Sequence, residues 1–276
     1  MALNWPTFFT RLGSAIVFSA IMMVGLLWNE WSFLALTALI QFLCLRDYFR
    51  LTHKISGSAP SFLLEQLTQV FALGMLLLVF FSIMPSVQSP FKEHAWPFLL
   101  FMPILLIMTG ALSKKSQWQQ AIEAMGGLLY ITLPCILFLG LRQKGFELPL
   151  ALILMIWMND TMAYLVGSFI GKTPFSPISP KKTWEGTAGG ALLTIAGAAV
   201  WGYYSKKYHL ADWMALAVCA AIAGTAGDLL ESKLKRMAGV KDSGTMMPGH
   251  GGALDRFDSL LVTVPFAFCY CWFFVG

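Results

Sequence analysis

The chain has 276 residues, of which 57% are hydrophobic and only 12% are charged, and its mean hydropathy is +0.68. A soluble globular domain carries about 25% charged residues, so this composition excludes soluble and disordered proteins. The net charge of +5 would suit nucleic acid binding in a soluble protein. In a membrane protein it reflects basic loops on one side of the bilayer, and we expect no nucleic acid partner.

Long apolar segments recur along the chain, each close to the roughly 17 to 25 residues that cross a bilayer as a helix. They predict an all-α fold, namely a polytopic transmembrane helical bundle with about nine spans. The predicted spans are 12–28, 31–45, 67–84, 96–112, 122–141, 148–168, 187–204, 212–228 and 257–275. The first segment is too long for a signal sequence and lacks a clear cleavage site, so we expect it to be retained.

Lysine and arginine residues gather in alternate loops. Most of them lie on the side of the N-terminus, which predicts a cytoplasmic N-terminus and an external C-terminus. The loops 169–186 and 229–256 are rich in charge, glycine and proline, and both fall on the cytoplasmic side. We therefore expect the function there.

The predicted organisation has three regions along the chain. Residues 1–95 form about three N-terminal membrane helices, and residues 96–170 form about three more, ending in Asn159–Asp160. Residues 171–276 carry the C-terminal helices and the cytoplasmic loops in which we expect catalysis. Five cysteines lie in apolar segments without a CxxC pair, which favours buried thiols over metal or redox chemistry.

Carboxylates inside membrane spans are rare and usually functional. Asp160 and Asp228 lie near the cytoplasmic ends of two inward-travelling spans, and Asp255 and Asp258 open the last span from the same side. Clustered carboxylates repel one another unless a cation neutralises them, and oxygen donors favour Mg²⁺. The alternative is a helical salt bridge between Asp255 or Asp258 and a basic neighbour.

Basic and hydroxyl side chains flank these carboxylates in sequence. A metal site that faces cations and hydroxyls is typical of polyphosphate binding. The loop Pro248–Gly252 places glycines and His250 just before a helix, where backbone N–H groups suit phosphate oxygens. We expect His250 to position this loop or a phosphate, with proton transfer as the alternative. The candidate phosphate-binding side chains are Lys172, Ser179, Lys181, Lys182, Thr183, Lys233, Lys235, Arg236 and Lys241.

Residues 232–259 resemble the signature of the phosphatidate cytidylyltransferases (CDP-diacylglycerol synthases). The similarity rests on Ser232–Arg236, Lys241–Gly244, Pro248–Gly252 and Leu254–Ser259. Upstream, Asn159–Asp160, Ala163–Tyr164, Gly171–Lys172 and Ser179–Gly186 also look like this family. The first five spans match it only in number and character. Met247 and Ala253 replace larger aliphatic residues of the family pattern, which affects packing and not the proposed ligands.

The resemblance implies transfer of a cytidylyl group from CTP to phosphatidate, giving CDP-diacylglycerol and pyrophosphate in phospholipid biosynthesis. It implies Mg²⁺ dependence, with a second cation also expected nearby. The residues that we expect to carry catalysis are Asp228, Asp255, Asp258, Lys235, Arg236 and His250. Asp228, Asp255, Asp258 and Asp160 are the expected metal ligands, and Lys172, Ser179, Lys181, Lys182, Thr183, Lys241, Asp242, Ser243, Gly251 and Gly252 the expected substrate-binding residues.

We expect an integral protein of the bacterial cytoplasmic membrane that meets phosphatidate in the bilayer, CTP in the cytosol and the surrounding membrane lipids. Small residues in the seventh span (Gly186, Gly189, Gly190 and Gly197) permit close helix contact, either inside one chain or in a homodimer. Two alternatives stay open: an ion-coupled transporter that uses Asp160 and Asp228, and a cytidylyltransferase that acts on an isoprenoid ether lipid.

Overall fold

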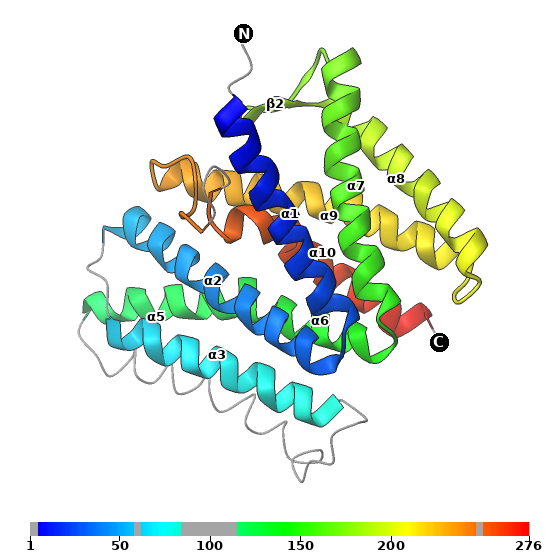
Figure 1. The fold of residues 1–276 in the computed structure, drawn as a ribbon. Helices are drawn as coiled ribbons and strands as arrows, with labels where there is room; N and C mark the ends of the chain where they lie inside the picture. Colours follow the sequence, from blue (N-terminus) through cyan, green and yellow to red (C-terminus); the bar gives the residue numbers. More distant parts are fainter. Residues whose placement is uncertain (1–4, 58–61, 84–114, 247–250, 276) are drawn as a thin grey trace. The chain divides into compact units, whose positions relative to one another are not determined.

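The computed structural model describes residues 5–57, 62–83, 115–246 and 251–275. Helices dominate these residues, and they group into two compact units (Figure 1). Unit 1 comprises Met1–Gln143 and Met237–Phe257, and unit 2 comprises Lys144–Arg236 and Asp258–Gly276. The boundary between the units passes through the last helix, after Phe257.

Unit 1 contains the first half of the chain. Its elements are α1 (Trp5–Leu27), α2 (Glu30–Ser56), α3 (Phe62–Ile83), α5 (Lys115–Gly127), the π-helical turn η1 (Leu128–Thr132), α6 (Leu133–Gln143) and the first turn of α10 (Leu254–Phe274). Helices α2, α3 and α6 pack on one another (Figure 1). Their core is apolar, and the rings of Phe33 and Phe138 lie 5.0 Å apart between α2 and α6.

The ends of α2 explain its length. Asn29 accepts a hydrogen bond from the backbone N–H of Ser32, and the Ser32 hydroxyl accepts one from the backbone N–H of Asn29, which forms a capping box. At the other end Gly57 has a φ of 65°, the left-handed conformation that terminates helices and that glycine adopts without strain. The predicted span 31–45 is therefore the first part of a longer helix.

Unit 2 contains α7 (Glu147–Ile170), the strands β1 (Pro174–Ser176) and β2 (Ser179–Thr183), α8 (Trp184–Ser205), α9 (Leu210–Met237) and the rest of α10. Helices α7 and α8 run side by side (Figure 1). A Cβ atom added to Gly186 would lie 2.6 Å from the Ala163 carbonyl oxygen, and one on Gly190 would lie 2.8 Å from the Ala163 backbone nitrogen. The predicted close contact is thus confirmed, and it lies within one chain.

The centre of the loop 169–186 forms an antiparallel hairpin. Pro174 pairs with Thr183, and Ser176 pairs with Ser179. Short polar strands of this kind lack the apolar alternation that predicts a strand, and Pro180 lies inside β2. The hairpin is small and leaves the all-α class unchanged.

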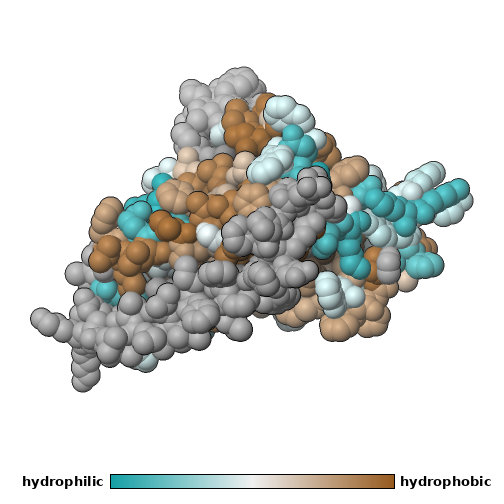
Figure 2. Space-filling view, turned by 90° about the horizontal axis from the view of Figure 1, so that it is seen from below, coloured by the Kyte–Doolittle hydropathy of each residue, from teal (hydrophilic) through white to brown (hydrophobic). Residues whose placement is uncertain are grey.

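The described helices coincide with eight of the predicted spans, and the span 96–112 lies outside the described residues. Among the described helices, six are long and apolar enough to cross a membrane. α8 is not one of the six because its glycines and terminal aromatic residues lower its hydropathy. Hydrophobic residues also cover much of the visible surface outside the grey atoms in Figure 2, as expected for a polytopic membrane protein. The total of nine spans stays a prediction.

Candidate active site

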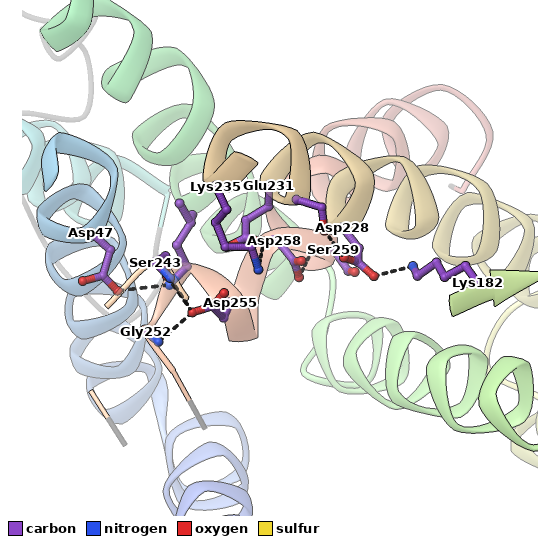
Figure 3. A network of polar contacts seen from close by, with 12 residues as sticks. Asp47, Lys182, Asp228, Glu231, Lys235, Ser243, Gly252, Asp255, Asp258 and Ser259 are labelled. Carbon is purple, nitrogen blue, oxygen red and sulfur yellow. Dashed lines mark hydrogen bonds and ion pairs between the residues drawn. The ribbon is translucent and has the colours of Figure 1, made fainter. Parts of the chain in front are cut away.

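Three carboxylates of unit 2 meet where α9 and α10 cross. Oxygen atoms of Asp228, Glu231 and Asp258 all lie within 4.8 Å of one another (Figure 3). Asp228 and Glu231 are three residues apart on α9 and therefore share one helix face. We call this set the acidic cluster.

Glycines on α9 allow α10 to come this close. A Cβ atom on Gly227 would lie 2.5 Å from the carbonyl oxygen of Asp258, so a larger residue would push the two helices apart. One turn earlier, the carbonyl oxygen of Gly224 accepts a hydrogen bond of 3.0 Å from the Ser259 hydroxyl. The backbone contact at these two positions brings Asp258 to the α9 carboxylates.

Two lysines form ion pairs with carboxylates of the acidic cluster. The Lys182 ammonium, on β2, forms an ion pair with Asp228, and the Lys235 Nζ atom lies 2.5 Å from the Glu231 Oε2 atom (Figure 3). Glu231 is completely buried, whereas Lys182 and Asp228 are each about one-third exposed. The cluster therefore has a buried side and a side that solutes can reach.

Hydroxyl and backbone donors fix the orientation of the cluster. The Ser232 hydroxyl donates to the Asp228 Oδ1 atom at 3.2 Å, and the backbone N–H of Ser259 donates to the Asp258 Oδ1 atom at 2.6 Å. Three carboxylates against two ammonium groups leave an excess of negative charge in a partly buried place. The atoms that could bind a metal ion are all carboxylate oxygens, which fits a hard divalent cation such as Mg²⁺.

Asp160 of α7 also belongs to this environment. It interacts electrostatically with both Lys182 and Asp228. Its neighbour Asn159 is buried, and its Oδ1 atom has no hydrogen-bond partner among the described residues. Three of the four predicted metal ligands (Asp160, Asp228 and Asp258) therefore lie in one part of unit 2.

Asp255, the fourth predicted ligand, lies in unit 1 and holds a loop. Its Oδ2 atom accepts hydrogen bonds from the Ser243 backbone N–H (2.9 Å), the Ser243 hydroxyl (2.8 Å) and the Gly252 backbone N–H (2.7 Å) (Figure 3). Gly251 has a φ of 81°, and a Cβ atom there would lie 2.6 Å from the same Oδ2 atom. Asp255 thus joins Ser243 to the glycines before α10, and its assignment as a metal ligand stays a prediction.

A second carboxylate of unit 1, that of Asp47 on α2, holds the same loop. Its Oδ2 atom accepts hydrogen bonds from the backbone N–H groups of Ala253 (2.6 Å) and Leu254 (3.4 Å). Cβ atoms on Gly244 and Gly252 would each lie 2.4 Å from a carboxylate oxygen of Asp47. Asp47 therefore stabilises the N-terminus of α10 and excludes larger residues from the loop.

Polar contacts also organise the hairpin of unit 2. The Glu185 carboxylate accepts hydrogen bonds from the backbone N–H groups of Lys172 (3.2 Å) and Thr173 (3.1 Å) and from the Thr173 hydroxyl (2.8 Å). A hydrogen bond from the backbone N–H of Glu185 itself, followed by those from Thr173 and Lys172, lowers the pKa of the Glu185 carboxyl to about 2. Thr183 caps α8 by accepting a hydrogen bond of 3.1 Å from the Gly186 N–H. Glu185 and Thr183 together fix the ends of the segment that presents Lys182.

The other predicted binding residues are more dispersed. Ser179 and Lys181 lie on β2, and the side chains of Lys172, Arg236, Lys241 and Asp242 are exposed. His250 lies outside the described residues, so its predicted function is untested. Substrate contacts at all these positions stay predictions.

Glu231 and Asp47 were not among the predicted site residues. Glu231 is spaced three residues from Asp228, a helical signal that could have identified it as a third ligand. Asp47 lies among Arg46, Arg50 and Lys54, and a basic segment of this kind indicates only the cytoplasmic side or contact with anionic lipid. Nothing in the local pattern indicates its contact with Ala253.

Comparisons with known proteins identify the family of the chain. A model of the cytidylyltransferase family matches residues 9–274. The phosphatidate cytidylyltransferases of Staphylococcus haemolyticus (strain JCSC1435) and Staphylococcus epidermidis (strain ATCC 12228) are each 37% identical over 171 residues, which is 60% of this chain and 65% of each relative. That of Staphylococcus aureus (strain COL) is 35% identical over 185 residues, 63% of this chain and 71% of the relative. The chain thus spans slightly less than two thirds of the first two relatives.

Proposed function

Because the chain belongs to the cytidylyltransferase family, we propose that it makes CDP-diacylglycerol and pyrophosphate from CTP and phosphatidate. In this reaction a phosphate oxygen of phosphatidate forms a bond to the α-phosphorus of CTP. The bond from that phosphorus to the oxygen bridging to the β-phosphate breaks, and its electron pair leaves with pyrophosphate. The observation that supports this activity most directly is the acidic cluster with its two lysines.

The proposed reaction needs electrostatic stabilisation more than proton transfer. The second pKa of a phosphate monoester is about 6, so the attacking oxygen is mostly deprotonated at neutral pH. The difficulty is to bring two polyanions together and to stabilise the leaving pyrophosphate. A partly exposed set of carboxylates and ammonium groups meets that need, whereas a strong general base is not required.

We propose that Asp228, Glu231 and Asp258 hold Mg²⁺. When bound there, Mg²⁺ would neutralise charge on phosphate oxygens. Lys182 forms an ion pair with Asp228, and Lys235 forms one with Glu231. We propose that the same ammonium groups bind phosphate oxygens of the substrates. Asp160 and Asp255 stay proposed metal ligands, either for this Mg²⁺ or for a second cation.

The proposed setting is the bacterial cytoplasmic membrane, with the acidic cluster on the cytoplasmic side. Asp242 is exposed in the described loop, so a cysteine at this position in a background without the native cysteines reports its side of the membrane. We expect it to react with an impermeant thiol reagent only in inverted vesicles. Reaction only in right-side-out vesicles would contradict this orientation.

The activity is tested with purified protein in detergent micelles, labelled CTP and phosphatidate, with Mg²⁺ present or chelated. We expect label to enter the lipid phase only with Mg²⁺, and to be lost in the Asp258→Asn variant. The Asp212→Asn variant is the matched control, because Asp212 is also a buried acid of unit 2 but binds His209 and Tyr270 instead. An isoprenoid ether phosphate serves as the competing acceptor. A folded protein that transfers no label to either lipid would contradict the proposal.

A further inference from the structure

Unit 2 contains a cavity that the proposed reaction does not use. The start of α7, the end of α8 and the start of α9 enclose a cavity of about 380 Å³. Its lining residues are Glu147, Trp201, Tyr204, Ser205, Lys207 and Trp213. Trp213 precedes Asp228 by fifteen residues on α9, a separation of about 22 Å along a helix. This cavity, which we call the aromatic pocket, is therefore distinct from the acidic cluster.

The charges of the aromatic pocket are one acid and one base. The Lys207 Nζ atom lies 2.6 Å from the Glu147 Oε2 atom, and no other acidic or basic side chain is among the described lining residues. Gly145, with a φ of 140°, allows this pair to form, since a Cβ atom there would lie 2.6 Å from the Glu147 Oε2 atom and 2.9 Å from the Lys207 Nζ atom. The pocket is electrically neutral overall but strongly dipolar.

One lining residue of the aromatic pocket, Trp213, has an indole N–H group without an acceptor among the described residues. Trp213 is completely buried, and its Nε1 atom has no hydrogen-bond partner among the described residues. Its ring is fixed by edge-on contacts with Trp201 (6.3 Å between ring centroids) and Tyr208 (5.5 Å). Because a buried N–H group without an acceptor is unfavourable, a bound acceptor would stabilise this arrangement.

The position of the aromatic pocket at the ends of apolar helices matches the depth expected for lipid headgroups. It is formed at the ends of α7 and α9, two of the helices that are long and apolar enough to cross a membrane. Tryptophan and tyrosine residues concentrate at the membrane–water interface, and Tyr204 and Trp201 are exposed at this end of unit 2. A ligand of the aromatic pocket would therefore most readily come from the bilayer.

We propose that the aromatic pocket binds the headgroup of a zwitterionic phospholipid of the phosphoethanolamine class. The primary ammonium group donates to Glu147 and lies against the rings of Trp201 and Tyr204, where cations are attracted to aromatic faces. The phosphate accepts from the Lys207 ammonium and from the Trp213 N–H. A quaternary ammonium cannot donate to Glu147, and an anionic headgroup would be repelled by it, so the pocket favours phosphoethanolamine over both.

Lipid binding to the full-length purified protein is measured by native mass spectrometry after exchange into lipid mixtures of equal mole fraction. We expect phosphatidylethanolamine to bind about tenfold or more tightly than phosphatidylcholine or phosphatidylglycerol, since one charge-assisted hydrogen bond contributes about that factor. The Lys207→Met variant should lose this preference, and the neighbouring Lys206→Met variant, which changes an exposed lysine outside the pocket, should retain it.

A charge exchange separates ligand binding from a structural ion pair. The Glu147→Lys/Lys207→Glu double variant retains an ion pair but reverses its polarity, so its thermal stability should be retained while its preference for phosphatidylethanolamine is lost. Equal binding of all three lipids by the wild-type protein, or an unchanged preference in the folded charge-exchange variant, would overturn the proposal. Displacement by soluble glycerophosphoethanolamine without any binding of the lipid would overturn the assignment to a membrane ligand.

Discussion

The Asp47 Oδ2 atom lies 2.6 Å from the backbone nitrogen of Ala253, although the two residues are 206 positions apart in the chain. Ala253 immediately precedes α10, so a carboxylate from α2 satisfies the N–H groups at the start of the last helix. This contact combines a helix cap with a favourable interaction between a negative charge and the helix dipole. It positions the helix that carries both Asp255 and Asp258.

Replacing Asp47 should therefore destabilise the start of α10. The Asp47→Ala variant should lose about 1–3 kcal/mol of stability, because buried N–H groups lose a charged acceptor. The Arg46→Ala variant is the control, since Arg46 is half exposed and lies 3.6 Å from the Asp47 carboxylate. Thermal unfolding of the detergent-solubilised variants measures the difference, and equal midpoints for the two would contradict the cap.

Glu231 should be required for cation binding although it is completely buried. The Glu231→Gln variant should bind Mg²⁺ about 10- to 100-fold more weakly, because it removes one of three carboxylates and leaves Lys235 without its ion pair. Calorimetric titration with Mg²⁺ measures this loss. Glu65→Gln, a change to a half-buried acid of unit 1, should bind normally, and equal affinities in both variants would exclude Glu231 from the site.

Gly227 should be intolerant of any side chain. The Gly227→Ala variant should lose about 1–3 kcal/mol of stability and most of its cation affinity, because the new methyl group would meet the Asp258 carbonyl and force α10 away from α9. The same change at Gly74 of α3 meets no atom within 4 Å and should be neutral or slightly stabilising. If thermal unfolding gave the reverse order, the close contact of α9 with α10 would be refuted.

The hairpin should loosen in acid. Since the pKa of Glu185 is lowered to about 2, its hydrogen bonds stabilise the fold fully above its ordinary value of 4.5. This stabilisation is lost as the pH falls from about 4.5 to about 2. Amide hydrogen exchange of residues 172–183 should be slower in the wild type than in Glu185→Gln at pH 6, and the difference should shrink towards pH 2. A constant difference across this range would contradict the assignment.

Hydropathy predicted the helices well because burial in lipid leaves long apolar segments, and eight of the nine predicted spans coincide with described helices. Spacing along the chain also indicated that Asp228 and Asp258 come from two helices of the same polar region. The Lys182–Asp228 ion pair could not be predicted, because it joins β2 to α9 and depends on a hairpin without a strand signal. Asp47 was overlooked because its function depends on a residue 206 positions away, whereas its neighbours indicate only topology.

The π-helical turn at Leu128–Thr132 changes how this membrane segment tolerates mutations of chain length. A π turn contains one residue more than the α-helical turn it replaces, with hydrogen bonds to the fifth residue along, here from the Leu133 N–H to the Leu128 carbonyl. Deleting one residue inside it can be absorbed by reversion to an α-helix. A deletion in α6 before Phe138 would instead rotate all later side chains by about 100° around the helix axis. Phe138 and Leu139 would then turn out of the core. This turn is therefore the place in the segment where evolution can add or remove a residue and keep the packing of unit 1.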